Sequence, residues 1–279
     1  MFPNRPSGLR SSSLVVTAVA ASALAGILTV QTARASLIAY EPFNYTAGSS
    51  LNGQAANSLG FTGTWSGGTA TINSGSLTYG SLATSGNSLA GGATEGTQLD
   101  LTTPVSATVG NPLWISFLMQ TPSASDVTTG WGGLVLYRSS SDSVFTYPFI
   151  GYANSGVFVL QTQGGENDVN GPSVSGNTTY LMVLEDVANS SGPDTLKLWV
   201  DPTPGVSSPA GSPTITDSLI GPIGDIYGLG TNDGAPTSYD EFRVGTTYAD
   251  VTPVPEPAAL GLLGIGAAGL LMLNRRRVS

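Results

Sequence analysis

The stretch Leu113-Trp-Ile-Ser-Phe-Leu-Met-Gln120 decides the fold class of this chain. Its alternating pattern puts Leu113, Ile115, Phe117 and Met119 on one side of an extended backbone, as in a β-strand with one face in a core. Shorter apolar runs follow, separated by Gly, Asn, Pro and Ser, at residues 134–137, 157–162, 180–187 and 195–201. These runs predict an all-β body.

The arrangement of the runs favours one two-sheet β-sandwich over a β-barrel or two domains, because many short strands fall within about 220 residues. No body segment of helical length has both helical spacing and usable caps. The runs 180–187 and 195–201 predict a hairpin. The Gly- and Ser-rich stretch 60–93 keeps apolar residues at intervals, so it predicts short strands with long turns.

Composition excludes several classes of function. The chain has 279 residues with 0 His and 0 Cys, which rules out disulfide scaffolds, thiolate zinc sites and catalytic triads that need imidazole. Residues 36–254 hold three basic and seventeen acidic side chains, a net charge of −14. Such a surface repels nucleic acid, so no nucleic-acid partner is expected.

The N-terminus, residues 1–35, has the pattern of a secretory signal peptide. Arg5 and Arg10 precede the apolar run Leu14–Val30, and Ala33-Arg34-Ala35 gives the small-residue pattern of a cleavage site. We expect cleavage between Ala35 and Ser36, which would export the body. The alternative is a membrane anchor that is never cut.

The C-terminus, residues 253–279, predicts a transmembrane helix. Pro255-Glu256-Pro257 precedes Ala258–Leu273, sixteen uncharged residues, and Arg275, Arg276 and Arg277 follow. A helix of that length covers about 24 Å, slightly less than a bilayer core of about 30 Å. The arginines would keep their end in the cytoplasm, so the body would lie outside.

This tail resembles the PEP-CTERM sorting signal of bacterial exported proteins, which combines a Pro-Glu-Pro motif, a short apolar helix and a basic cluster. The resemblance implies recognition and cleavage by an exosortase-type membrane enzyme in species that make exopolysaccharide. It therefore implies a transient inner-membrane anchor, followed by release to the cell surface or extracellular matrix. The alternative is an ordinary tail anchor whose prolines form a stiff linker.

The body resembles laminin-G-like, concanavalin-type domains of exported proteins over residues 36–252. The opening Ala39-Tyr-Glu-Pro-Phe-Asn-Tyr45 and the ending Tyr239-Asp-Glu-Phe-Arg-Val-Gly-Thr-Thr-Tyr248 carry the likeness, together with Gly48 and Leu51-Asn-Gly-Gln54. It implies a concanavalin-like (jelly-roll) β-sandwich in which the first and last strands lie near one another. These motifs indicate a fold and no activity.

Acidic residues give no convincing catalytic site. Laminarinase-type glycoside hydrolases of this fold carry Glu-x-Asp-x-x-Glu on a strand. Here Glu166-Asn-Asp168 begins that pattern, but position 171 is Gly, and the neighbouring glycines predict a solvated turn. Glu185-Asp186 and Asp240-Glu241 are adjacent pairs, so each should divide between opposite faces of a strand. We expect no catalytic residues.

Two tryptophans are candidates for carbohydrate contact. Trp65 and Trp131 lie among glycines, where a loop could expose the ring, although packing beneath a loop is the simpler expectation. Trp114 and Trp199 lie in predicted strands and should belong to the core. Calcium is a weak cofactor candidate on the loop oxygens of Asp126, Asp142, Glu166 and Asp168, without EF-hand spacing.

Three functions remain open at this point. The first is a non-enzymatic exported protein, structural or adhesive and associated with exopolysaccharide, that is sorted by its tail. The second is a carbohydrate-binding module on the cell surface, which would contact extracellular polysaccharide. The third is a glycoside hydrolase with an atypical site.

Overall fold

The computed structural model describes residues 37–91, 96–139, 148–162, 167–218 and 224–255. All of these residues belong to one compact unit of the chain. The predicted signal peptide and the tail from Glu256 onward therefore lie outside the described residues. Within those residues, no helix is long and apolar enough to cross a bilayer.

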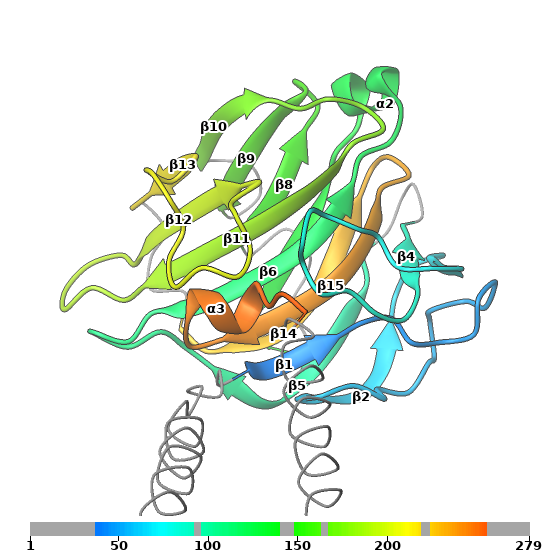
Figure 1. Ribbon diagram of the computed structural model, residues 1–279, viewed down its shortest axis with the longest axis horizontal. Helices are drawn as coiled ribbons and strands as arrows, with labels where there is room; N and C mark the ends of the chain where they lie inside the picture. Colours follow the sequence, from blue (N-terminus) through cyan, green and yellow to red (C-terminus); the bar gives the residue numbers. More distant parts are fainter. Residues whose placement is uncertain (1–36, 92–95, 140–147, 163–166, 219–223, 256–279) are drawn as a thin grey trace, which may run out of the picture. The chain divides into compact units, whose positions relative to one another are not determined.

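One sheet of the body has eight strands (Figure 1). Its main path runs β13-β12-β11-β6-β15-β4-β3, and β1 also pairs with β15. The bounds are β1 Leu37–Glu41, β3 Thr71–Asn73, β4 Ser88–Ala90, β6 Leu113–Gln120, β11 Thr179–Val187, β12 Thr195–Val200, β13 Ile215–Asp217 and β15 Ser238–Gly245. All of its strand pairs are antiparallel.

The other sheet has seven strands in the order β10-β9-β8-β7-β14-β5-β2. The bounds are β2 Phe61–Ser66, β5 Gln98–Val105, β7 Gly132–Tyr137, β8 Phe149–Ala153, β9 Val157–Thr162, β10 Asn167–Ser173 and β14 Ile226–Asp233. The short helix α2, Ala124–Thr129, packs against β8. The two antiparallel sheets form the predicted jelly-roll β-sandwich.

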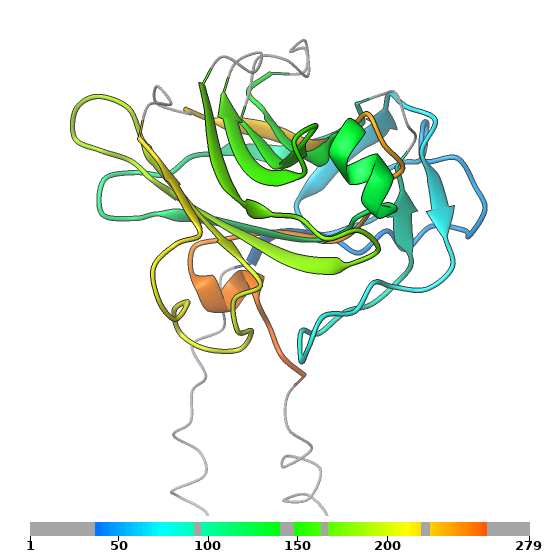
Figure 2. The same cartoon turned by 90° about the horizontal axis from the view of Figure 1, so that it is seen from above.

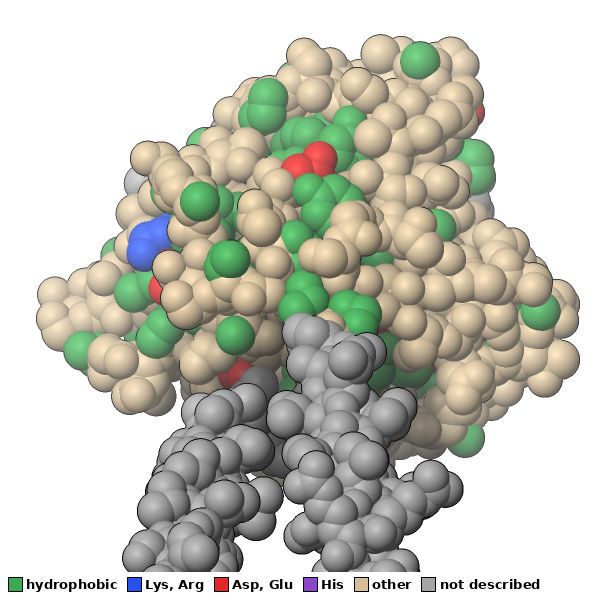
Figure 3. Space-filling model, in the orientation of Figure 1, with side chains coloured by type: hydrophobic (Ala, Val, Ile, Leu, Met, Phe, Trp, Pro, Cys, Tyr) green, Lys and Arg blue, Asp and Glu red, His purple; other side chains and the backbone are tan. Residues whose placement is uncertain are grey.

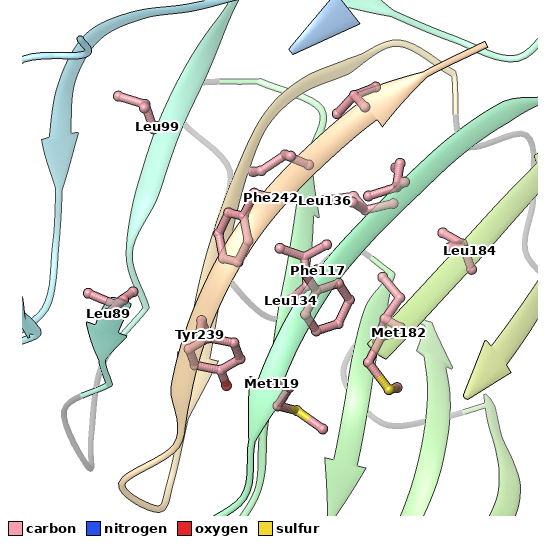
Figure 4. Packing of buried hydrophobic residues seen from close by; sticks show 14 of the residues in the cluster. Leu89, Leu99, Phe117, Met119, Leu134, Leu136, Met182, Leu184, Tyr239 and Phe242 are labelled. Carbon is pink, nitrogen blue, oxygen red and sulfur yellow. The ribbon is translucent and has the colours of Figure 1, made fainter. Parts of the chain in front are cut away.

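The main core lies between the sheets. Leu113, Ile115, Phe117 and Met119 of β6 all belong to it, which confirms the period-two prediction. Figure 4 shows Phe117 and Met119 beside side chains of β11 and β15, with Leu134 of β7 in the same cluster. Burial of large apolar side chains such as these stabilises a fold by about 1.5–3 kcal/mol each.

A second, smaller core covers the outer face of the eight-stranded sheet. Trp114 and Trp199 stack there with ring centroids 5.6 Å apart, and Tyr248 packs edge-on against Trp114. Both tryptophans are buried as predicted, but away from the main core. The cover consists of residues 74–87, which we call the strap, the loop 202–214, and the helix α3, Tyr248–Val251. Figure 2 shows α3 and the loop on this outer side.

The first and last strands of the body lie side by side, as the resemblance implied. Strand β1 pairs with the second half of β15, from Leu37 opposite Gly245 to Glu41 opposite Phe242. The first half of the same edge pairs with β4. The hairpin of β11 and β12 and the short strands within residues 60–93 are also confirmed.

One local prediction was wrong. Residues 167–173 form strand β10 rather than a turn. Strand β10 is an edge strand, and its register with β9 shifts between Asn170 and Ser173, so the backbone there accommodates Gly171-Pro172. Proline is tolerated at edge strands and bulges because no regular hydrogen bond between strands requires its missing N–H there.

Candidate functional site

The last described residues of the body are fixed to two separate loops, and we call this arrangement the clasp. The N–H of Ala83 in the strap donates to the carbonyl of Pro253 at 2.8 Å. The N–H of Gly205 donates to the carbonyl of Thr252, also at 2.8 Å. Gly205 lies so close to the Val254 side chain that a Cβ added to this glycine would meet it at 2.6 Å. The chain is therefore held until one residue before Pro255.

Helix α3 leads the chain into the clasp. Thr247 caps this helix, with Asp250 accepting hydrogen bonds from the Thr246 and Thr247 N–H groups at 3.0 and 2.7 Å. The buried Ser116 hydroxyl on β6 donates to the Val251 carbonyl at 2.6 Å. The capping box and this bond satisfy backbone groups at both ends of a helix that is too short to be stable alone.

The strap is anchored in turn by a buried ionic network on β15. Arg243 pairs with Glu241 and donates from the same Nη2 to the Ala83 carbonyl at 2.6 Å. The N–H of Ser85 donates to Glu241 at 2.6 Å. The guanidinium also lies 4.8 Å from the centroid of the Tyr40 ring. Ala83 thus joins the network through its carbonyl and the clasp through its N–H.

Asp240 fixes the other end of the strap. Its carboxylate accepts hydrogen bonds from the Ser76 hydroxyl and, at 2.8 Å, from the Leu77 N–H. The residue is fully buried. Burial, together with the neighbouring Glu241 carboxylate, raises the pKa of Asp240 to about 8, although its hydrogen bonds act in the opposite direction. Burial likewise raises the pKa of Glu241, while Arg243 lowers it.

Asp240 and Glu241 do not divide between opposite faces, contrary to the prediction for a regular strand. The register of β15 against β6 shifts between Asp240 and Arg243, and Glu241 has a φ of +60°. Tyr239 and Phe242 point into the main core, so the two residues between them both contact the strap. A bulge of this kind re-aims side chains. The pair serves here as an anchor for the strap.

The other adjacent acidic pair divides as predicted. Glu185 forms an ion pair with Lys197 on β12 at 2.9 Å. Asp186 is buried, and its Oδ1 has no hydrogen-bond partner. Burial and the nearby Asp194 raise the pKa of Asp186 to about 7. The two carboxylates therefore do not act together.

The two candidate tryptophans for carbohydrate contact have different environments. Trp65 lies in strand β2 and is only 1% exposed, and its indole N–H donates to the Tyr45 hydroxyl at 3.1 Å. Trp65 cannot contact a glycan, because packing beneath the 43–54 segment closes it off from solvent. Trp131 is 36% exposed and packs over Gly234. Its Nε1 lies 3.5 Å from the Asn232 side-chain oxygen.

The calcium candidates are not brought together by the described structure. Asp126 lies in the first turn of α2 and accepts a hydrogen bond from the capping residue Ser123 at 2.7 Å. Asp142 and Glu166 lie outside the described residues, and Asp168 lies in β10. Among the described side chains, no group of three metal-ligating residues is suitably placed.

The sorting residues follow directly after the clasp. Pro255 is the last described residue and is exposed, whereas Glu256, Pro257 and Arg275 to Arg277 lie beyond the described part, as do Ala35 and Ser36. Residues 253–277 match the family model of the PEP-CTERM protein-sorting motif. The chain carries a PEP-CTERM motif. The first residues of this PEP-CTERM motif, Pro253 and Val254, are therefore also the residues held by the clasp.

The chain is similar to solved structures at low identity. An endo-beta-1,4-glucuronan lyase from the fungus Trichoderma reesei is 15% identical, with a TM-score of 0.42, covering 66% of this chain and 90% of the lyase. The Emp46p carbohydrate recognition domain in its metal-free form is 11% identical, with a TM-score of 0.41 and coverages of 65% and 88%. A protein of unknown function from Shewanella oneidensis MR-1 is 14% identical, with a TM-score of 0.44 and coverages of 88% and 98%.

Comparison with curated proteins gives no match. Sequence reasoning located the PEP-CTERM motif but missed the clasp that holds its first two residues. Ala83 and Gly205 are separated from Pro253 by long stretches of chain, and neither has a distinctive sequence pattern. A signal was present at Gly205, since a glycine after proline in a loop often marks a positive φ, here +76°.

Proposed function

We propose that this chain is an exported, non-enzymatic extracellular protein whose tail is recognised and cut by an exosortase-type membrane enzyme. The body would then pass to the cell surface or the extracellular matrix, with a structural or adhesive role beside exopolysaccharide. The observation that carries this proposal is the PEP-CTERM motif at residues 253–277, whose first two residues are also the last fixed residues of the body.

The chemistry of the tail supports a transient membrane anchor. Pro255 and Pro257 lack backbone N–H groups and favour an extended chain, which leaves the Glu256 side chain accessible. The apolar segment Ala258–Leu273 would stop the chain in the bilayer. Arg275 to Arg277 would hold its end on the cytoplasmic side, because an arginine at the bilayer centre costs at least about 2.5 kcal/mol. Together these features keep the motif at a fixed height at the outer boundary.

The use of buried carboxylates in the body supports a non-enzymatic role. Asp240 and Glu241 are occupied by strap N–H groups, a serine hydroxyl and Arg243. Glu185 is occupied by Lys197. A glycosidase needs two carboxyl groups that face one substrate, about 5–9.5 Å apart. The contacts of these pairs serve the fold instead.

Replacement of the glutamate in the motif tests the proposal. We expect Glu256→Ala to leave membrane insertion intact and to block processing, so that the full-length chain accumulates in the membrane fraction. Asp225→Ala, which removes an exposed carboxylate from the body, is the matched control and should be released as efficiently as the parent. If Glu256→Ala is released at the parental rate, the tail is an ordinary membrane anchor and the sorting proposal is wrong.

A carbohydrate-binding role is the second candidate, and the environment of Trp131 favours it. A half-exposed indole beside the Asn232 amide combines a stacking face with a hydrogen-bonding group. A glycan array with the purified body, with and without calcium, tests this role. Binding that Trp131→Ala abolishes would support it, and an array without signal would leave the structural or adhesive role.

A further inference from the structure

The clasp leaves very little chain between the folded body and the proposed membrane span. Val254 packs against Gly205, and the apolar segment begins at Ala258. Four consecutive Cα steps reach at most about 14 Å when fully extended. The headgroup layer on one side of a bilayer takes up about 5–8 Å of that reach. The surface around Val254 must therefore lie close to the lipid headgroups while the tail is uncut.

We define the exit face as the strap, residues 74–87, the loop 202–214 and helix α3. These three segments surround Thr252–Val254 through the clasp bonds and through the Tyr248 hydroxyl, which donates to the Thr203 carbonyl at 2.7 Å. All three cover the outer side of the eight-stranded sheet (Figure 2). The chain thus leaves the body through the middle of one defined surface.

The exit face differs in charge from the rest of the body. The strap and the loop 202–214 contain no Asp, Glu, Lys or Arg, and the only charged residue of α3, Asp250, is buried in its capping box. One exposed carboxylate, Asp201, borders the face, directly before the loop and in contact with Tyr79 of the strap. The space-filling view of this side shows charged side chains in only a few small patches (Figure 3). The body as a whole carries a net charge of −14 between residues 36 and 254.

This distribution of charge suits contact with a bilayer surface. Membranes that contain anionic lipids repel a strongly acidic protein. A face rich in hydroxyl groups, with Asp201 as its one bordering exposed carboxylate, meets much less repulsion, and hydroxyls can hydrogen-bond to headgroup oxygens. The exposed Val206 adds an apolar side chain within the loop.

We propose that the exit face is a lipid-contact surface, on which the body rests against the outer headgroups until the tail is cut. This inference rests on the proposed membrane span. It adds that the body is held in one orientation, so that the Pro-Glu-Pro motif lies between the exit face and the bilayer. A processing enzyme must then approach the motif from the side, within the membrane.

The absence of native cysteine permits a direct test with single-cysteine labels. Ala249→Cys on α3 and Val206→Cys on the loop are exposed positions of the exit face, and Thr129→Cys on α2 is an exposed control on the part that packs against β8. The chain from Ser36 to Ser279, without the expected signal peptide, is reconstituted in vesicles of phosphatidylcholine and phosphatidylglycerol, and each label is quenched by lipids that carry a nitroxide headgroup. We expect quenching at positions 249 and 206 to exceed that at 129 at least three-fold.

Insertion of a linker distinguishes the proposed lipid-contact surface from the proposed membrane span on which it rests. Twelve Gly and Ser residues between Val254 and Pro255 should lower quenching at position 249 to the control value, with no change in flotation with the vesicles. Equal quenching at all three positions in a chain that floats would overturn the lipid-contact surface alone. Quenching at positions 249 and 206 could exceed that at 129 only after exosortase-containing membranes are added. That result would overturn the lipid-contact surface and indicate that the exit face contacts a protein partner. A chain that does not float would overturn the membrane span and this inference with it.

Discussion

Ala83 connects a buried ionic network to the end of the body, because its carbonyl accepts from Arg243 while its N–H donates to Pro253. The two bonds are 2.6 and 2.8 Å long and involve adjacent peptide groups. A residue without chemical function of its own thus couples the acidic bulge of β15 to the position of the sorting motif. The predictions below follow from this connection and from the packing around it.

Gly205 should be a sensitive position of the clasp. A Cβ there would collide with Val254 at 2.6 Å, and the φ of +76° is unfavourable for other residues. We expect Gly205→Ala to destabilise the clasp by about 1–3 kcal/mol and to speed amide exchange at Ala83. Gly211→Ala is the matched control, because Gly211 has a φ of +77° in the same loop but no atom within 4 Å of its Cβ position. Equal exchange rates in the two variants would contradict the role of the Val254 contact.

The body should lose stability as the pH rises from about 4 to about 8. The pKa of Asp240 is about 8 in the folded chain and about 3.9 in an unfolded one, so over that window only the folded state keeps the proton. The free energy of unfolding then falls by at most about 1.4 kcal/mol per pH unit for this group. Asp186, with a pKa of about 7, acts in the same direction. Urea midpoints at pH 5 and pH 8 measure the effect.

Asp240→Asn tests that assignment, since an amide oxygen still accepts from Ser76 and Leu77 but carries no titratable proton. We expect the variant to show a smaller difference between the two urea midpoints than the parent. Asp225→Asn, at an exposed position, should leave the difference unchanged. If Asp240→Asn does not reduce the pH dependence of the urea midpoint, that dependence arises from other carboxylates.

The two glycine-flanked tryptophans should respond differently to truncation. Trp65→Ala removes a fully buried side chain that stacks near Phe43, so the free energy of unfolding should fall by about 3–5 kcal/mol. Trp131→Ala removes a half-exposed ring and should cost less than about 1 kcal/mol. Chemical denaturation of both variants, compared at one pH, measures the contrast. A large loss for Trp131→Ala would mean that its contact with Gly234 is structural.

The mature chain should begin at Ser36, one residue before β1 starts at Leu37. Mass spectrometry of the exported protein identifies its first residue. Ala35→Arg should block cleavage, because signal cleavage sites need a small residue there, whereas Arg34→Gln should not. Mature protein that still contains Leu14 would contradict the signal-peptide interpretation.

The sequence predicted the sandwich well because its strands bury one face in a regular pattern. The four inward residues of β6 follow directly from alternation. Alternation could not predict that Leu118 is buried too, or that Trp114 belongs to an outer core on the other face, because their cover comes from the strap and α3, which are distant in the sequence. The burial of Trp65 agrees with the simpler expectation of packing beneath a loop, but the pattern could not identify its partner Tyr45, which lies twenty residues earlier.

The bulge of β15 could not be predicted from the sequence, for a different reason. A positive φ at a glutamate is rare, and Glu241 keeps it because Arg243 and the Ser85 N–H hold the carboxylate in place. Those contacts exist only in the complete fold. Local residue preferences therefore predicted that Asp240 and Glu241 lie on opposite faces of the strand. Tertiary contacts instead direct both side chains toward the strap.

The pairing of β1 with β15 sets the order of events during export. In a chain that crosses the membrane from its N-terminus, Leu37–Glu41 emerges first and finds its neighbour only when Ser238–Gly245 has followed. Contacts between residues so far apart in sequence form slowly. Pro255 lies only ten residues beyond Gly245, so the sheet can close only shortly before the proposed membrane span reaches the bilayer. The short segment between Gly245 and Pro255 therefore determines how soon the proposed cleavage signal follows completion of the fold.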